Sequence, residues 1–278
     1  MSKPNVGVLG LGIIGSRVVE NLRQSGHEVF VWSRSARAVP NFLASPREVA
    51  QAAGFIQIFV RDSKALLDSV KDMLPVLKAG HIVMNHATVS KKATQEAAKM
   101  VEDAGAAFLD APFTGSKMAA QNAKLCYYIG GSATLLERAH PVLEASAAKI
   151  MPLGSIGDAM VLKIVTNLVS SVIVEALAEA ASITHANGIP LQRLLTALEG
   201  NANYSTLIGM KLPAIMNGDF EPHFSLRNML KDADFARELA EEAKLALPAL
   251  EITAEVMRQG VNAGHGDFDF SIIGKRLL

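Results

Sequence analysis

The chain has 278 residues, half of them hydrophobic, and its 27 lysines and arginines balance its 27 aspartates and glutamates. This composition supplies a sizeable core and excludes a mainly disordered chain, while the zero net charge excludes a global field that would attract nucleic acid or an anionic membrane. The single cysteine, Cys126, excludes an internal disulfide and a multi-cysteine metal site, so we expect a reducing, cytoplasmic location.

Neither the start of the chain nor its most apolar run predicts a membrane segment. The first residues, MSKPNVGVLGLGIIG, contain regularly spaced glycines and no small-residue cleavage site, so they do not predict a signal peptide. The run 164–183 is interrupted by Asn167, Glu175 and Glu179, which argues against a membrane span. We therefore expect a soluble protein without a membrane partner.

Up to about residue 153, short β-rich segments alternate with helical patterns. The helical segments 45–54 and 90–105 each begin at a serine cap and end at glycine. This alternation predicts βαβ units and a mainly parallel sheet. The expected strands are 5–10, 28–33, 55–60, 81–86, 106–111, 125–130 and 149–154.

After Gly157 the strand signal disappears and long helical patterns follow. We therefore expect an α/β fold with two domains. Residues 1–155 would form a Rossmann domain with a doubly wound parallel sheet, and residues 156–278 an all-α domain for substrate binding and oligomerisation. A long apolar helix starting near Gly157 would join them, and its few polar breaks predict a homo-oligomer, either a homodimer or a homotetramer.

A glycine-rich turn lies between the first expected strand and the first helix. Gly10, Gly12 and Gly15 have the G-x-G-x-x-G spacing, which lets a backbone approach a pyrophosphate at a helix N-terminus. The position in a βαβ unit makes this motif specific. The cofactor-binding residues expected here are Gly10, Leu11, Gly12, Ile13, Ile14 and Gly15.

The end of the second expected strand indicates which cofactor is bound. NAD sites usually have an acid there for the ribose hydroxyls, but no acid occurs between Glu28 and Glu48. The segment instead supplies Ser33, Arg34 and Ser35, followed by Arg37. A guanidinium flanked by hydroxyls suits a 2′-phosphate, so we expect NADP, with NADPH preferred over NADH.

A lysine interrupts the apolar segment 157–174, GDAMVLKIVTNLVSSVIV. Lysine is rarely buried without a partner, so Lys163 either extends its ammonium to water or serves a reaction. Asn167 lies one turn further along the same helix face. The pattern places a cation and an amide next to each other in an apolar setting.

Several motifs occur in the order found in one enzyme family. They are GLGIIG, NHATVS, DAPFTGSKMAAQNAKL, GSIGDAMVLKIVTN and LKDADFA. On these motifs the chain resembles the β-hydroxyacid dehydrogenase family, which includes 3-hydroxyisobutyrate dehydrogenase, over almost its whole length. The GSK at 115–117 and the closing GHGDFDFS are most similar to the glyoxylate/succinic semialdehyde reductase branch.

The resemblance implies an NADPH-dependent oxidoreductase that interconverts small aldehyde or keto acids and hydroxy acids, and a small carboxylate as substrate. It assigns Lys163 as the catalytic acid/base and Asn167 as its partner. It places Thr88, Thr114, Gly115 and Ser116 around the substrate carboxylate, and Lys231 near both nicotinamide and substrate. The further cofactor contacts that it implies are Val60, Arg61, Thr88 and Lys231.

The chain departs from the family pattern at several positions. Ala87, preceded by His86, replaces a serine, and Thr114 follows Phe113 where the family has another serine. Lys124 follows Ala123 in a segment where the family has glycine and then threonine or glutamine. These departures leave the reaction type intact but the substrate undetermined.

Two other functions remain open: an imine reductase of the same fold, in which the lysine is usually replaced, and a non-catalytic nucleotide-binding module. His86 is either a pocket acid/base or a hydrogen-bonded structural residue. Asp110 and Asp232 could hold cofactor or water, and Asp232 could instead pair with Lys231 or Arg237 on its own helix. Tyr204 and Phe235 could line a substrate wall but more simply form core. The seven histidines show no metal-binding spacing, so we expect no metal.

Overall fold

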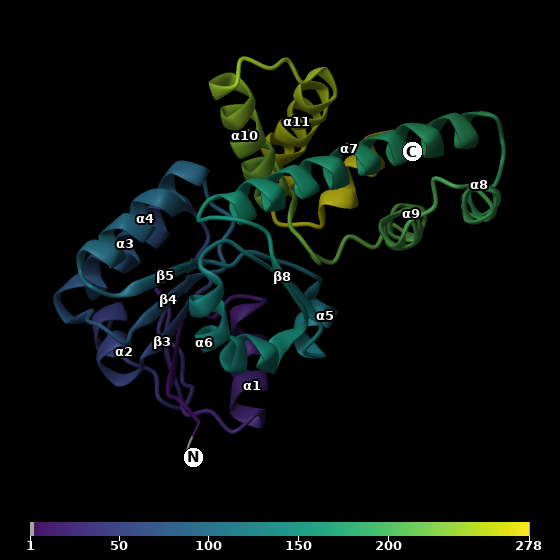
Figure 1. Cartoon of the computed structure of the whole chain (residues 1–278). Helices are drawn as coiled ribbons and strands as arrows, with labels where there is room; N and C mark the ends of the chain where they lie inside the picture. The colour runs from purple at the N-terminus through teal and green to yellow at the C-terminus, as the bar shows by residue number, and fades with distance from the viewer. Residues whose placement is uncertain (1–2, 278) are drawn as a thin grey trace. The chain divides into compact units, whose positions relative to one another are not determined.

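The computed structural model describes residues 3–277, and the chain divides into two compact units, Met1–Lys163 and Ile164–Leu278. The N-terminal unit contains strands and helices, and the C-terminal unit is helical (Figure 1). The division falls inside one long helix, α7 (Asp158–Ala186). The expected fold class, a Rossmann-type sheet followed by helices, is confirmed.

A five-stranded parallel sheet is the centre of the N-terminal unit, with the strand order β2-β1-β3-β4-β5. Its strands are mostly buried because helices cover both faces, as parallel sheets require. The strands are β1 (Val6–Leu9), β2 (Val29–Trp32), β3 (Phe55–Ile58), β4 (Ile82–Asn85) and β5 (Ala107–Asp110).

Most helices of this unit begin at a local side-chain cap. A serine or aspartate accepts a backbone N–H three residues further on, as at Ser45, Asp62 and Ser90. Such caps satisfy amides that have no partner in the first turn. The helices are α1 (Gly15–Gln24), α2 (Pro46–Ala52), α3 (Ser63–Met73), α4 (Lys91–Asp103), α5 (Lys117–Gln121) and α6 (Ala133–Leu143), with 3₁₀ turns η1 (Leu74–Val76) and η2 (Glu144–Ser146).

The last expected strands form a second sheet instead of extending the first. Its order is β6 (Phe113–Thr114), β7 (Leu125–Ile129), β8 (Ala147–Pro152), with β6 antiparallel to β7. The chain turns after β5 at Pro112, whose carbonyl accepts from the N–H of Tyr128. Two residues are too few to show a periodicity of two, so the sequence did not predict β6.

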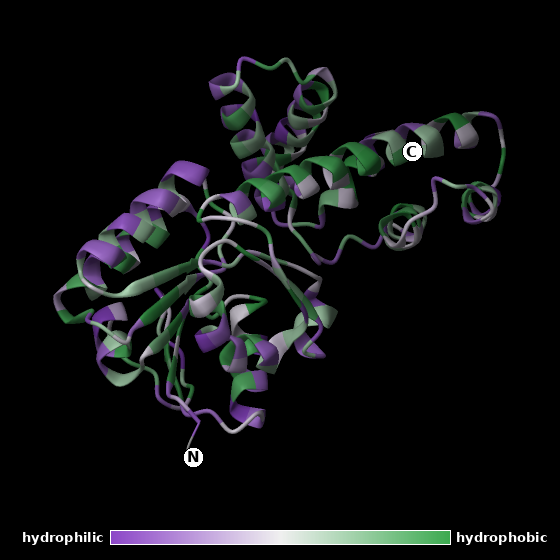
Figure 2. Cartoon of the chain, in the orientation of Figure 1, coloured by the Kyte–Doolittle hydropathy of each residue, from purple (hydrophilic) through white to green (hydrophobic). Residues whose placement is uncertain are grey.

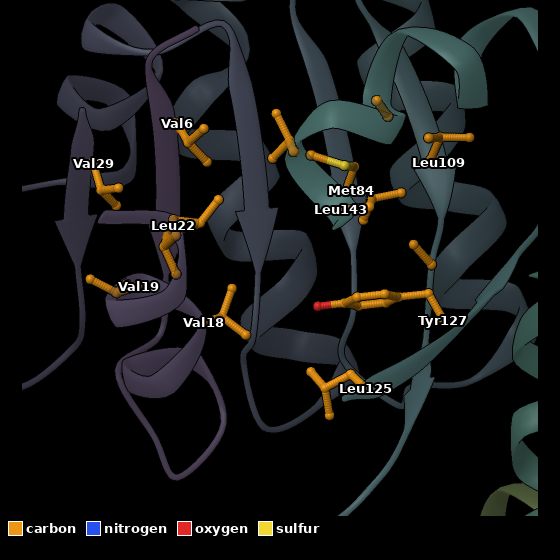
Figure 3. Close-up of a cluster of buried hydrophobic side chains, with 14 of the residues drawn as sticks. Val6, Val18, Val19, Leu22, Val29, Met84, Leu109, Leu125, Tyr127 and Leu143 are labelled. Atoms are coloured by element: carbon orange, nitrogen blue, oxygen red, sulfur yellow. The ribbon is translucent and has the colours of Figure 1, made fainter. Parts of the chain in front are cut away.

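A single apolar core joins the two sheets and α1. Figure 3 shows Val18, Val19 and Leu22 of α1 among side chains from both sheets. Tyr127 is buried there, and its hydroxyl lies 2.8 Å from the Ser146 hydroxyl. Each large buried side chain contributes roughly 1.5–3 kcal/mol to folding, so this core fixes the carboxyl ends of the strands.

The C-terminal unit is helical apart from one isolated bridge between Ser225 and Asp269. The expectation of an all-α second domain is therefore confirmed. After α7 its elements are α8 (Leu191–Glu199), α9 (Thr206–Asn217), α10 (Leu226–Glu242), α11 (Pro248–Gly260), η3 (Val261–His265) and η4 (Phe270–Leu277).

Helix α7 is apolar along most of its length (Figure 2). Among the described residues it is the one helix long and apolar enough to cross a membrane by length and composition, a test that core helices of soluble proteins also pass. Its buried Glu175 forms an ion pair with Arg276 of η4, with Nη1 3.1 Å from Oε2. That pair attaches the end of the chain to α7.

Candidate cofactor and catalytic site

The glycine loop stands between β1 and α1. A β-carbon at Gly10 would collide with the carbonyl of Phe59, and one at Gly15 would collide with the carbonyl of Gly10. Gly10 also has φ +102°, a conformation that side chains disfavour. Packing inside the chain therefore accounts for two of the three glycines.

Gly12 is different, because a β-carbon there would meet no atom within 4 Å. Nothing within residues 3–277 requires glycine at this position, whereas a ligand that approaches the backbone would require it. Ile14, the N-cap of α1, makes no side-chain capping bond. The amides of Ser16 and Arg17 already donate to the carbonyls of Gly12 and Ile14, so the loop backbone that precedes them is the part of the turn that can meet an anion. Of the other loop residues, Leu11 is buried and Ile13 is 46% exposed. A dinucleotide pyrophosphate fits this cradle.

The hydroxyl and guanidinium groups expected to bind a 2′-phosphate follow β2, which pairs with β1 beside the glycine loop. Ser33 is half-buried, and its hydroxyl donates to the carbonyl of Ser35 at 2.7 Å. Arg34 is exposed, and its guanidinium has no bonded partner among residues 3–277. The loop thus presents a cation to solvent at the end of β2.

Val60 and Arg61 follow β3, next to the strand that carries the glycine loop. Val60 is half-buried. Arg61 is exposed, with Nε 3.4 Å from Oδ2 of Asp62, which caps α3. The two residues therefore lie at the carboxyl edge of the sheet, where parallel sheets bind ligands.

Thr88 lies beyond β4, after an aromatic cluster. His86 is fully buried, stacks on Phe59 at 4.5 Å and lies 2.7 Å from the Ala111 carbonyl through Nδ1. Burial lowers the pKa of His86 to about 4, although the bond to Ala111 opposes this. A neutral imidazole in a packed cluster is a structural group, so the structure gives no support for His86 as an acid/base. Thr88 is half-buried.

The segment expected to bind the substrate carboxylate lies on β6 and the start of α5. Phe113 pairs with the buried Tyr127, so Thr114, the next residue, lies on the opposite face of that sheet. Gly115 has φ +135°. The Ser116 hydroxyl caps α5 by accepting from the Ala119 N–H at 3.4 Å.

Lys163 and Asn167 occupy successive turns of α7, as expected, and are 9% and 8% exposed. Asn167 donates from Nδ2 to Oδ2 of Asp232 at 2.6 Å. A carboxylate only accepts hydrogen bonds, so this contact fixes the amide with Oδ1 as its acceptor. The other oxygen of Asp232 lies 2.8 Å from Nζ of Lys231.

Asp232 therefore connects two of the residues expected in the site, Asn167 on α7 and Lys231 on α10. It is almost fully buried. The sequence suggested the pairing with Lys231 as an alternative to a ligand-binding role, but it could not show the bond to Asn167, which is 65 residues away.

Asp110, at the end of β5, accepts backbone N–H groups at the start of α7. Its Oδ2 lies 3.0 Å from the amide nitrogens of both Gly157 and Met160. Burial raises the pKa of Asp110 to about 7, against the lowering effect of these two bonds.

Two remaining candidates have packing contacts. Tyr204 is exposed, and its hydroxyl occupies the space beside Gly209 of α9. Phe235 lies under the Lys231 ammonium, 5.0 Å from Nζ to the ring centre. Within residues 3–277, no group of three or more His, Cys, Asp or Glu side chains could hold a metal ion.

Two family models match the chain in succession. The NAD binding domain of 6-phosphogluconate dehydrogenase matches residues 5–157, and the NAD-binding model of NADP-dependent 3-hydroxyisobutyrate dehydrogenase matches residues 157–277. Both models describe binding of a nicotinamide dinucleotide, in agreement with the glycine cradle.

Similar proteins fall into two groups by length. The cytokine-like nuclear factor N-PAC of Anopheles gambiae is 28% identical, but the chain spans only about half of that protein (98% of this chain, 50% of the relative). Glyoxylate/succinic semialdehyde reductase 1 of Arabidopsis thaliana is 26% identical over 96% of both proteins. The solved structure of Mycobacterium tuberculosis 3-hydroxyisobutyrate dehydrogenase with L-serine has a TM-score of 0.90 at 26% identity, over 99% of both chains.

Proposed function

This chain belongs to the β-hydroxyacid dehydrogenase family, and we propose that it is an NADPH-dependent reductase of small aldehyde or keto acids. The observation that carries the proposal is Lys163, a buried lysine of α7, one turn from an amide whose orientation is fixed by Asp232. The second support is the cradle at Gly12, which the packing of the chain itself does not require.

The chemistry needs a hydride for the carbonyl carbon and a proton for the carbonyl oxygen. NADPH, when bound, supplies the hydride. An ammonium beside the oxygen stabilises the developing negative charge and donates the proton, and we assign this role to Nζ of Lys163. The resulting neutral amine regains a proton from solvent. Because Oδ1 of Asn167 is an acceptor one turn away, it can accept a hydrogen bond from the Lys163 ammonium.

The substrate we propose is an aldehyde acid of the glyoxylate or succinic semialdehyde kind, with 3-hydroxyisobutyrate as a related hydroxy acid. The similarity to the Arabidopsis reductase over nearly the full length of both proteins supports this class. Thr114, with its hydroxyl on the non-core face of β6, and Thr88 would bind the carboxylate together with Gly115 and Ser116.

The second candidate is a nucleotide-binding module without turnover, because N-PAC bears the name of a nuclear factor and not of an enzyme. The two functions are separated by measuring NADPH oxidation with glyoxylate, succinic semialdehyde, methylmalonate semialdehyde, tartronate semialdehyde and a cyclic imine. We expect turnover with an aldehyde acid. Binding of NADPH without turnover of any of these would support the module, and turnover of the imine alone would indicate an imine reductase.

The test of Lys163 is the variant Lys163→Ala, with the exposed Lys92→Ala on α4 as its control. Loss of a positioned acid/base costs about 10²–10⁴ in turnover, whereas NADPH affinity should not change. A Lys163→Ala enzyme that keeps more than a tenth of its turnover would remove the proton-donor assignment.

The preference for NADPH rests on Arg34. Arg34→Ala should weaken NADPH binding about tenfold or more and leave NADH binding almost unchanged, because a charge-assisted bond is worth about 1.5–3 kcal/mol. Arg47→Ala is the control, since that arginine pairs with Asp72. Equal loss for both cofactors in a fluorescence titration would exclude the 2′-phosphate role.

We also propose a homo-oligomer, a homodimer or homotetramer. Helix α7 has exposed apolar side chains near one face. They are spaced by three, four and fourteen residues, at Leu162, Val165, Val169 and Ile183. Such a stripe is unusual on a monomer surface. Light scattering at micromolar concentration tests this, and a mass of one chain would refute it.

A further inference from the structure

The start of α7 is held differently from the starts of the neighbouring helices. Ser45, Ser90 and Ser132 each cap a helix locally, by accepting from a residue three positions ahead. At the start of α7, the amides of Gly157, just before the helix, and of Met160, in its first turn, donate to Asp110, which lies 47 and 50 residues earlier in the chain. A local cap fixes where a helix begins, but a bond to a strand also fixes the helix against the sheet.

Other contacts hold the same turn from several sides. Gly130 at the end of β7 packs so closely on the Ser155 carbonyl that a β-carbon there would collide with it. The N–H of Gly131 donates to the carbonyl of Gly154 at 2.9 Å. Asp110 itself bonds Gly130 through both of its backbone groups, at 3.0 and 2.7 Å. Asp110 is therefore the residue at which β5, the end of β7 and the start of α7 meet.

Lys163 follows directly from this anchored turn. It lies three residues after Met160, which is about one helical turn, and it is the last residue of the N-terminal unit. A slip of the helix start by one residue would move the backbone of Lys163 by about 1.5 Å along the axis. Misplacement of a reacting group by about 1 Å can cost 10²-fold in rate.

From this geometry we propose that Asp110 is a positioning residue for Lys163, one that sets the place of the catalytic ammonium through the first turn of α7. The inference rests on the proposed function, since it takes Lys163 as the proton donor. Asp110 is fully buried and its side-chain bonds go to the backbone amides of Gly157 and Met160, so we assign it a positioning role and not a role in proton transfer.

The test uses Asp110→Ala, Asp110→Asn and the control Asp158→Asn in the full chain. Asp158 is an exposed carboxylate of the same turn, and in the part of the chain that the structure describes its side chain bonds the Ser155 amide alone, at 2.8 Å. We expect Asp110→Ala to lower kcat about 10- to 100-fold with little change in NADPH affinity. Asp110→Asn keeps an acceptor oxygen and should restore most of kcat, and Asp158→Asn should match the parent.

A double variant separates positioning from general damage. In the Lys163→Ala background, Asp110→Ala should change the remaining turnover less than about threefold, because residues that act as a unit are not additive. The same 10- to 100-fold loss in both backgrounds would overturn the inference. So would a fall in kcat for Asp110→Asn equal to that for Asp110→Ala.

A readout independent of turnover keeps the inference testable if no substrate is reduced. Reductive ¹³C-methylation gives an NMR signal for Lys163, which is assigned by its loss in Lys163→Arg. Asp110→Ala should shift this signal and speed amide exchange at Met160, while Asp158→Asn should not shift it. If the Lys163 signal does not move in Asp110→Ala, the positioning role is overturned. If the signal shifts in Asp110→Ala but the parent reduces no substrate, only the proposed function has failed.

Discussion

Replacing Lys211 with methionine should cost stability and leave turnover intact, the opposite of the effect expected at Lys163. Lys211 on α9 is 5% exposed and Asp269 is 2% exposed, with Nζ 2.7 Å from Oδ1. The ammonium also lies 4.4 Å above the ring of Phe270. This pair is therefore buried, and neither residue is among those assigned to the proposed chemistry.

The expected loss of stability depends on which charge each variant leaves unpaired. Removing one partner of a buried ion pair costs about 3–5 kcal/mol. After Lys211→Met, Asp269 still accepts from the amides of His223, Phe224 and Ser271 and from the Ser271 hydroxyl, so we expect a loss near the lower limit. Asp269→Asn leaves a buried ammonium with only an amide oxygen and a ring, so its loss should lie near the upper limit.

Urea unfolding at neutral pH followed by far-UV circular dichroism measures these losses. Trp32, the only tryptophan, lies on β2 of the N-terminal unit and would not report on α9. The double variant Lys211→Met/Asp269→Asn should lose less than the sum of the single variants, since it leaves no unpaired charge. A loss below about 1 kcal/mol for Lys211→Met, or strict additivity, would refute the reasoning.

The pH dependence supplies a second check. Burial raises the pKa of Asp269, but Lys211 and the Ser271 bonds outweigh burial and hold it below its usual value. A lowered folded-state pKa gives stability that is present above the unfolded-state pKa of about 4 and is lost as the pH falls below it. In Lys211→Met burial is no longer outweighed by the ammonium, so the folded-state pKa of Asp269 rises and this acid-side loss should become smaller or reverse in sign.

Three further predictions concern the N-terminal unit. Gly12→Ala should weaken NADPH binding and change the free energy of unfolding by less than about 1 kcal/mol. Its control, Gly15→Ala, should destabilise the fold because the added β-carbon collides with the Gly10 carbonyl. Equal NADPH affinity of Gly12→Ala and the parent would contradict the role of Gly12 in cofactor binding. Ala123 has φ +53°, so Ala123→Gly should stabilise the chain by about 0.5–1 kcal/mol, whereas Ala119→Gly inside α5 should destabilise it, as measured by urea unfolding. The pKa of His86 is lowered to about 4, so its contribution to stability is lost as the pH falls from about 6.5 through 4. His86→Phe should reduce this decline in the free energy of unfolding by up to about 3 kcal/mol. An unchanged dependence of the free energy of unfolding on pH would show that His86 does not take up a proton on unfolding.

The parallel sheet could be predicted because its strands are near-continuous apolar runs between helices with serine caps. The second sheet could not, because β6 has two residues and its partner β7 lies beyond a short helix. The family pattern has glycine at Ala123, and the left-handed backbone there explains why. The sequence alone shows only the substitution, whereas the structure shows the strain that this chain accepts.

The glycine motif illustrates a different limit. Its spacing predicts a dinucleotide turn but treats all three glycines alike. Only the structure shows that Gly10 and Gly15 serve the packing of the loop, while Gly12 faces open space. Likewise, Asp110 and Asp232 are visible as acids in the sequence, but their partners lie 47 to 65 residues away and follow no periodicity.

Lys163 and Lys211 show how far a single local pattern can be taken. Each interrupts an apolar helix, in AMVLKIV and in LIGMKLPAI, so the reasoning that singled out the first applies equally to the second. The structure separates them by their surroundings. Lys211 meets a carboxylate that organises a loop and the C-terminal segment, which is a sufficient structural reason for a buried charge. Lys163 instead follows a turn anchored by Asp110 and precedes an amide fixed by Asp232. Two buried acids hold the helix on either side of Lys163, and such preorganisation is what a proton donor needs and a lysine that merely reaches solvent does not.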